Sequence, residues 1–422
     1  MKLLMTKMFA LLVLFLLLQI PLNWTQHTIQ ERSNYRQQAI SSIAKNQADA
    51  QRVIGPILKM PYTRTYWHEH KDNNNNIIRE RQTDKLFITL LPDQLDINGD
   101  MQVDERKKGI FPIPVFRTNL TLKGSFNVID LSTLKINNDD EITLGKPIVI
   151  VSLSDQHGIK NVEALQWGNT TNSFSPGAKI DLQNNEGLSA VLNSAPTPGN
   201  VSFQVNLSVI GTQSFSIVPI GIQNTFNMQS NWPHPQFKGS QLPDKRSINN
   251  HGFTATWQTT ELATNIHSFW EKCQNNSLQC DSLINEEIGV SLFESVDIYQ
   301  QAERAVKYGF LFLSITFIAF LLYEVLCQLA IHPVQYGLVG LALAIFFLLL
   351  LSFSEHVGFA PAYLIASSSC ITLLGFYIHA IFKRWVRSGL FIGILAALYG
   401  VIYIILQLED AALLAGSIML FT

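Results

Sequence analysis

The chain has 422 residues, enough for two or three domains, and its formal net charge of −2 excludes the strongly basic surface of a nucleic-acid-binding protein. Hydrophobic residues make up 47% of the chain and charged residues 15%, an average over a polar first part and an apolar second part. The sequence contains no P-loop, zinc-protease, nucleophile-elbow or C-x-x-C motif, so we expect no cofactor, no metal site and no catalytic residue.

The N-terminus predicts a membrane anchor. Lys2 and Lys7 precede an apolar run that continues to Leu22, and no small-x-small cleavage site follows it. We therefore interpret residues 1–22 as an uncleaved transmembrane anchor with its lysines in the cytoplasm, in preference to a secretory signal peptide. Residues 23–54 are mostly polar, and we expect them to form a helix that leads out of the anchor.

Residues 55–295 show the period-two pattern of β-strands. From Val201 to Val209, apolar and polar residues alternate strictly, as expected for an antiparallel strand with one buried face. Asn98 and Gly99 form a typical hairpin turn pair. We predict a large, mostly antiparallel, sandwich-like β domain, and the sequence leaves open whether it is one unit or two. A connecting helix is then expected over residues 296–307.

Residues 308–422 predict a C-terminal multi-span transmembrane domain. Four apolar segments, each long enough to cross a hydrocarbon core about 30 Å thick as a helix, cover residues 308–327, 334–352, 358–382 and 389–406. A further segment begins at residue 411 but has only 12 residues, so the last span is either a half-span or incomplete. The whole pattern predicts a mixed membrane protein with a C-terminal bundle of about five transmembrane helices.

The placement of positive charge predicts the orientation of the chain. If Lys2 and Lys7 are cytoplasmic, residues 23–305 lie on the opposite side of the membrane. The basic loop that contains Lys383, Arg384 and Arg387 then returns to the cytoplasm. This agrees with the positive-inside rule, under which lysine and arginine concentrate in cytoplasmic loops.

The predicted topology also places several polar residues at the outer ends of the third and fifth spans. These residues are Glu355, His356, Gln407, Glu409 and Asp410. Burial of polar groups at membrane depth costs free energy, so we expect these residues to have a structural or functional role. They could cap the helices and stop them from sliding, or they could form a site for a proton, an ion or a partner. We treat the five residues as the candidate functional polar cluster.

Small residues recur at helical spacing in the apolar part. Gly358, Ala362 and Ala366 repeat every four residues, and Gly389 and Gly393 form a G-x-x-x-G motif. Such faces let helices approach closely. We expect them to pack within the bundle, with a contact between copies of the chain as the alternative.

Two of the four cysteines lie in the polar part of the chain. Cys273 and Cys280 are separated by a short polar segment. An oxidising compartment would allow them to form a disulfide, as it does in many exported domains.

Short motifs spread over nearly the whole chain point to one family. In the apolar part they cover residues 304–309, 331–336 and 354–359, and in the β-rich part they include residues 95–100, 231–233 and 242–246. In these motifs the sequence resembles the CreD family, bacterial inner-membrane proteins of cell-envelope integrity. The resemblance implies a multi-pass inner-membrane protein with a large periplasmic domain and a link to envelope stress, and it supplies no catalytic residues.

Taken together, these features favour a non-enzymatic membrane protein that acts through its β domain and its helix bundle. Its expected partners are the lipid bilayer and envelope proteins or lipids, and nucleic acid is not expected. A transporter or ion-coupled component that uses the polar cluster is the first alternative, and a membrane-bound enzyme is the second. The oligomeric state does not follow from the sequence.

Overall fold

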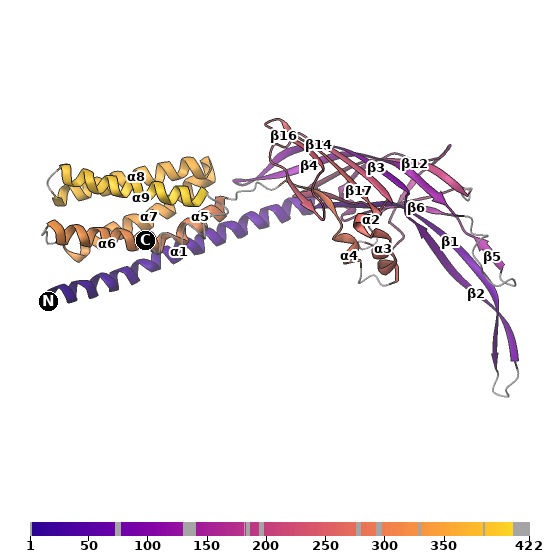
Figure 1. Ribbon diagram of the computed structural model, residues 1–422, viewed down its shortest axis with the longest axis horizontal. Helices are drawn as coiled ribbons and strands as arrows, with labels where there is room; N and C mark the ends of the chain where they lie inside the picture. The colour runs from indigo at the N-terminus through magenta and orange to yellow at the C-terminus, as the bar shows by residue number, and fades with distance from the viewer. Residues whose placement is uncertain are drawn as a thin grey trace. The chain divides into compact units, whose positions relative to one another are not determined.

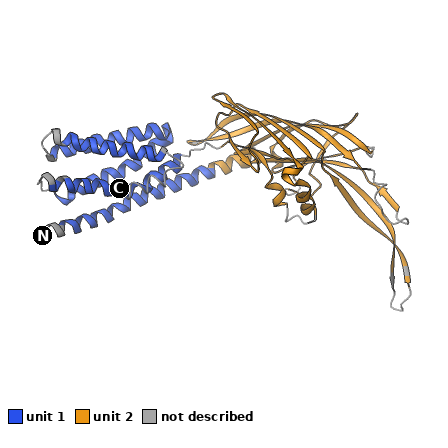
Figure 2. Cartoon of the chain, viewed as in Figure 1, with its two compact units in different colours: residues 1–38, 296–422 blue, residues 39–295 orange. Residues whose placement is uncertain are grey.

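The computed structural model describes the chain apart from residues 1, 72–76, 130–140, 181, 183–185, 194–197, 276–279, 293–297, 328–330, 383–384 and 408–422. It contains two compact units (Figure 2). The first, here called the helical unit, comprises Met1–Gln38 and Val296–Thr422, and the second, the β unit, comprises Ala39–Ser295. The β-rich part is therefore one unit, a point that the sequence had left open.

The helical unit consists of helices, most of them long and apolar, together with the short polar helix α5 (Figure 1). They are α1 (Lys2–Gln47, which ends in the β unit), α5 (Ile298–Lys307), α6 (Gly309–Cys327), α7 (Pro333–Val357), α8 (Phe359–Phe382) and α9 (Trp385–Gln407). By length and composition, α1, α7, α8 and α9 can each span a membrane, and α5 with α6, which meet at a bend of 40°, can form one more span. The predicted mixed membrane fold is confirmed, while the predicted last segment, residues 411–422, lies outside the described residues.

The predicted helix over residues 23–54 is wrong at its C-terminal end. Helix α1 ends at Gln47, where Ala48 takes a positive φ of 109°, and strand β1 begins at Gln51. Val53 and Ile54 are buried and pair in parallel with strand β13. Sheet pairing and burial therefore override the local helical tendency of this segment.

Two nine-stranded sheets form the β unit. In the first, the order is β10 (Phe174–Pro176), β11 (Gly187–Val191), β6 (Ile148–Leu153), β1 (Gln51–Lys71), β13 (Ser214–Val218), β18 (Ile288–Ser291) and β15 (Gln236–Gly239), with β2 (Ile77–Leu90) and β5 (Glu141–Leu144) paired to β1. In the second, the order is β16 (Lys245–Asn249), β17 (Gly252–Thr260), β14 (Gln223–Ser230), β3 (Gln94–Lys108), β4 (Phe111–Val128), β12 (Gly199–Thr212), β8 (Leu165–Trp167) and β9 (Thr170–Asn172), with β7 (Ile159–Val162) paired to β12.

The short helical elements of the β unit are η2 (Gln156–Gly158), α2 (Glu261–Thr264), α3 (Ile266–Asn275) and α4 (Asp281–Ile284). Among the described strand pairs, β1 with β13 and β3 with β14 are parallel and the others are antiparallel. This confirms the predicted mostly antiparallel topology.

One apolar core joins the two sheets. Phe215 of β13, in the first sheet, lies 5.9 Å between ring centroids from Phe116 of β4 and 6.5 Å from Phe226 of β14, both in the second sheet. All three rings are buried. The alternation predicted for the segment 201–209 is also present, because alternate side chains of β12 are buried in this core. The β unit is therefore sandwich-like, as the sequence predicted.

The hairpin turn predicted at Asn98 and Gly99 is wrong. Both residues lie inside β3, which pairs with β4 on one side and with β14 on the other. The chain turns instead near Gly109, whose φ of +62° suits a tight turn between β3 and β4. A turn pair is a local signal, and here two neighbouring strands hold it in extended conformation.

Candidate functional site

Glu355 lies in the last turn of α7 and binds side chains from two other helices. The guanidinium of Arg32, on α1, donates to both carboxylate oxygens, from Nε to Oε1 at 2.7 Å and from Nη2 to Oε2 at 2.8 Å. The hydroxyl of Tyr299, on α5, donates to Oε1 at 2.8 Å. Tyr299 is buried, and only 10% of the Glu355 side chain is exposed. We call these three residues the Glu355 clasp.

A second carboxylate, Glu324 on α6, is held in a similar way. The ammonium of Lys7, on α1, pairs with Oε1 and also donates to the carbonyl of Ile331 at 2.6 Å. The hydroxyl of Tyr336, on α7, donates to Oε2 at 2.8 Å. Only 12% of the Glu324 side chain is exposed. We call Lys7, Glu324 and Tyr336 the Glu324 clasp.

The two clasps lie on either side of the apolar run of α1: Lys7 directly precedes the run, and Arg32 lies ten residues after its last residue, Leu22. Lys7 and Arg32 are 25 residues apart in the sequence, about 38 Å along a helix that rises 1.5 Å per residue. A hydrocarbon core is about 30 Å thick, and a bilayer with its interfacial regions is about 40–45 Å thick. The spacing therefore suits one clasp near each membrane boundary, where charged groups are least costly.

Between the clasps, α1 packs against small residues of α7. A Cβ atom at Gly340 would lie 2.2 Å from Cδ1 of Leu18, and one at Gly337 would lie 3.2 Å from Cδ1 of Leu14. A larger residue at position 340 would displace the Leu18 side chain, because the first of these distances is far below van der Waals contact. Glycine is used here as it commonly is between membrane helices, to allow close approach.

Each clasp combines one cation, one carboxylate and one tyrosine hydroxyl from three different helices. The charges cancel within each clasp, and the carboxylate oxygens accept hydrogen bonds, so the groups can stay mostly buried. Loss of one partner would leave the other charge buried and unpaired, which is strongly destabilising. The arrangement fits a structural tie between α1 and the C-terminal helices.

The β unit contains a comparable group around Glu287. The Arg52 Nε lies 2.6 Å from Glu287 Oε2, the Lys238 Nζ lies 3.0 Å from Oε1, and the Ser216 hydroxyl donates to Oε2 at 2.8 Å. Burial alone would raise the pKa of Glu287. Hydrogen bonds from Arg52, Ser216 and Lys238 outweigh that effect and hold the pKa below its usual value.

The predicted polar cluster is only partly described by the structure. Glu355 points to Arg32 and Tyr299, and its neighbour His356 is exposed. Gln407 is the last residue of α9, and Glu409 and Asp410 lie outside the described residues. The contacts of Glu355 favour the interpretation as a helix cap for this residue, and the five residues as one site stay a prediction.

The small residues of α8 have different roles. Ala362 and Ala366 are buried, and on the same stripe the thiol of Cys370 donates to the Ala342 carbonyl of α7 at 3.5 Å. Gly358 instead ends α7 with a φ of +82°, and a Cβ atom there would meet nothing within 4 Å. The predicted close packing is therefore present at the two alanines, and at Gly358 the need is for a left-handed backbone.

Gly389 and Gly393 lie on the exposed face of α9. A Cβ atom at either position would meet nothing within 4 Å of the described part of the chain. The helix turns Phe391 and Leu395, both buried, toward the bundle. Among the described residues, bulky side chains occupy the buried face of α9, and packing of this G-x-x-x-G motif inside the bundle stays a prediction.

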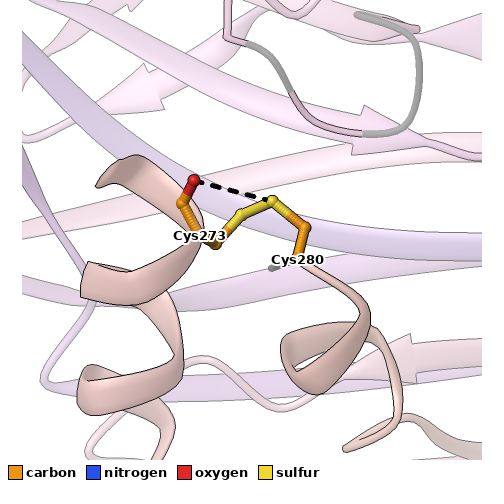
Figure 3. Close-up of a disulfide and its surroundings, with 2 residues drawn as sticks. All are labelled: Cys273 and Cys280. Carbon is orange, nitrogen blue, oxygen red and sulfur yellow. Dashed lines mark hydrogen bonds between the residues drawn. A yellow bond between two sulfur atoms is a disulfide. The ribbon is translucent and has the colours of Figure 1, made fainter. Parts of the chain in front are cut away.

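Cys273, on α3, and Cys280, immediately before α4, are joined by a disulfide (Figure 3). Both residues are buried in the core of the β unit. The pairing is the one that the sequence predicts, and its formation in the cell stays a prediction that alkylation can test.

Sequence reasoning missed the partners of both carboxylates. Lys7 was interpreted only as a topology signal, and Arg32 only as part of a polar helix. The sequence gives only a partial signal: Lys7 directly precedes the apolar run of α1, whereas Arg32 lies ten residues beyond its end at Leu22, in the polar segment. Among the residues that the structure describes, no group of three or more His, Cys, Asp or Glu side chains is placed to hold a metal ion.

Comparisons with known proteins agree with this architecture. The sequence matches the family model for the inner membrane protein CreD over residues 3–422. It is 36% identical to the inner membrane protein CreD of Escherichia coli (strain K12) over 416 residues, which cover 98% of this chain and 89% of that protein. The M1 zinc metallopeptidase of Deinococcus radiodurans covers 40% of this chain and 38% of its own, with 12% identity and a TM-score of 0.21, too low to support any argument. On the sequence matches and the apolar helices, the chain is a membrane protein and belongs to the CreD family of inner membrane proteins.

Proposed function

We propose that this chain is a non-enzymatic inner-membrane protein that supports cell-envelope integrity and the response to envelope stress. The observation that carries the proposal is the pair of clasps, which tie α1 to the C-terminal helices at two positions, Lys7 and Arg32. The chain enters the β unit through α1 and leaves it toward α5. Both connections to the β unit therefore start from one helical body in the membrane.

The proposed orientation puts the β unit in the periplasm. Lys2 and Lys7 at the start of α1, Lys383 and Arg384 between α8 and α9, and Arg387 at the start of α9 are then cytoplasmic. Under this topology the cytoplasmic loops between the predicted spans, residues 328–333 and 383–388, have only a few residues each, too few for a kinase, an ATPase or a DNA-binding module. The β unit is large by comparison, and we propose that stress is sensed or answered there or in the bilayer.

Fusion of a reporter that is active only in the periplasm tests the orientation. We expect activity for fusions within the β unit, for example after Ser240, and none for a fusion after Arg384. An active fusion at Arg384 would overturn the proposed topology.

The disulfide provides an independent test of the same placement. A thiol pair in the oxidising periplasm should be oxidised, so Cys273 and Cys280 should resist alkylation until the protein is reduced. Free thiols at both positions in protein extracted from cells, with alkylation before lysis, would argue against periplasmic placement.

Loss of the protein tests the role in the envelope. Cells without it should change their resistance to envelope-directed agents while every metabolic activity is kept. The full chain should restore resistance, and residues 23–305 exported as a soluble protein should not. Full rescue by the soluble part would point instead to a diffusible enzyme or binding protein.

A further inference from the structure

The second sheet presents a face of short polar side chains to solvent. In β3, Ile97 and Met101 point into the core, whereas Asn98 and Asp100 point outward. The same alternation holds in the neighbouring strands. The outward residues lie on the central strands of the sheet, each of which has a neighbouring strand on both sides.

The strand register sets these polar residues in two rows that run across the sheet. One row contains Asn206, Thr121, Asn98, Asn227 and Thr256 and ends on Lys245, and the other contains Ser208, Asn119, Asp100, Gln229, Thr254 and Ser247. With strands about 4.8 Å apart, a row over five or six strands is about 19–24 Å long. The face is therefore long enough for several units of an extended polymer.

This face is hollowed where the short side chains lie. The central hollow, of about 440 Å³, is lined by residues of β3, β4, β14 and β17. A second hollow of about 360 Å³ shares Asn119 and Thr121 with it, and a third of about 390 Å³ shares Asp100, Gln229 and Thr254. We call the three hollows together the polar trough.

The chemistry of the trough is mainly that of neutral amides and hydroxyls. The Asn227 amide donates to Asn98 Oδ1 at 3.1 Å, and the Thr256 hydroxyl donates to Asn227 Oδ1 at 2.9 Å. These bonds orient the side chains, and each amide still has further donor and acceptor capacity. Short asparagine and threonine side chains also lose less entropy on binding than lysine or glutamate would.

The lining argues against other classes of ligand. Its charged residues are Asp100, Lys123 and Glu163, so it offers no cluster of cations for an anionic polymer. The apolar residues along it, such as Leu120 and Met228, are buried. It therefore lacks the exposed aromatic or apolar anchors on which protein interfaces depend.

Another exposed surface of the β unit has a different composition from the trough. In the hairpin of β1 and β2, Arg79 pairs with Glu69 at 2.5 Å, and Arg81 pairs with Glu141 of β5. That exposed surface follows the usual pattern of alternating charges, whereas the trough is built mainly from neutral polar groups.

We infer that the polar trough binds a neutral, hydroxyl-rich carbohydrate chain. Sugar hydroxyls both donate and accept hydrogen bonds, so they match a surface of oriented amides and hydroxyls with little charge. The rows of the sheet would run along the carbohydrate and bind several sugar units in succession. This inference does not depend on the clasps or on the proposed role in the envelope.

Titration of the full chain with oligosaccharides tests the inference. The protein is placed in phospholipid nanodiscs, since maltoside detergents are themselves carbohydrates, and titrated calorimetrically with maltohexaose, cellohexaose and chitohexaose. We expect at least one probe to bind with a Kd of about 1 mM or tighter, as measured by its heat of binding. No binding of any of the three at about 10 mM would overturn the inference, as would tighter binding of the polyanion heparin.

Variants assign the binding to the trough. Asn119→Ala with Asn227→Ala should weaken it by about tenfold or more, the equivalent of about 1.4 kcal/mol. Gln82→Ala, on β2 away from the trough, should leave it unchanged. If the double variant melts at a lower temperature than the native chain, Thr254→Lys, at an exposed position, fills the trough without removing a core contact. Native affinity in a folded trough variant would contradict the inference.

Discussion

The two clasps and the Glu287 group use the same chemistry in different surroundings. In each, a largely buried carboxylate accepts hydrogen bonds from a cation and a hydroxyl. In the β unit two cations, Arg52 and Lys238, share Glu287. In the described part of the helical unit each of the two carboxylates forms a salt bridge with one cation, and both cations come from α1. We therefore expect the loss of one cation to destabilise the β unit less than it destabilises the helical unit.

Glu355→Ala should give the largest effect. It removes the ion pair with Arg32 and the hydrogen bond from the buried Tyr299, so we expect a loss of about 2–3 kcal/mol in the free energy of unfolding of the helical unit, less than for a fully buried pair because 34% of the Arg32 side chain is exposed. The measurement is thermal or denaturant unfolding of the full chain in nanodiscs. His356→Ala, at the exposed neighbouring position, is the control and should change little.

A second substitution at this position, Glu355→Gln, separates the two interpretations of the polar cluster. If Glu355 is part of a clasp, Glu355→Gln should lower the amount of folded protein in the membrane together with the cellular phenotype. If the phenotype is lost while the protein level stays normal, Glu355 belongs to a working site and the clasp is not its main role.

Packing of α1 can be tested without changing any charge. Gly340→Leu would push a side chain into Leu18, so we expect it to cost about 1–3 kcal/mol of unfolding free energy. Gly393→Leu is the matched control, because a side chain at that position meets no described atom within 4 Å. Equal effects of the two changes would show that α1 does not pack on α7 as the structure has it.

Much of the fold follows from local signals in the sequence. Apolar length predicts the membrane helices, and the period-two alternation of β12 predicts a half-buried strand. The start of β1 and the extended Asn98–Gly99 pair were not predictable, since partner strands from distant parts of the sequence determine both. The clasps depend on pairs separated by 317 and 323 residues, a separation at which no spacing rule operates.

The Glu287 group should show the smaller, pH-dependent effect. Its pKa lies below the usual value, so the ionised carboxylate stabilises the β unit above about pH 4.5, and this contribution is lost as the pH falls through the folded-state pKa. Glu287→Gln should cost about 1–2 kcal/mol near pH 7, since a neutral acceptor remains for its partners. Unfolding curves from pH 7 to pH 3 should show the native and variant proteins converging. A constant difference would mean that ionisation of Glu287 does not stabilise the fold.

The two clasps should also differ in their tolerance of a change of cation. Arg32 donates to both oxygens of Glu355, so Arg32→Lys loses one hydrogen bond and should cost about 1 kcal/mol. Lys7 binds one oxygen and a carbonyl, and we expect Lys7→Arg to cost less, about 0.5 kcal/mol or below. The unfolding free energies of both variants are measured under one condition. A larger loss for Lys7→Arg than for Arg32→Lys would show that the two-oxygen contact of Arg32 is not what distinguishes the clasps.

Exchange of the charges in the Glu355 clasp tests the central claim most directly. Arg32→Glu places two carboxylates together and should lower both the unfolding free energy and the resistance of cells to envelope-directed agents. Adding Glu355→Arg restores an opposite pair between the same two helices. We predict that the double variant recovers a large part of both quantities relative to Arg32→Glu, measured as unfolding in nanodiscs and survival of cells. A double variant no better than the single variant in either measurement would contradict the account that an ion pair at this position ties α1 to the bundle.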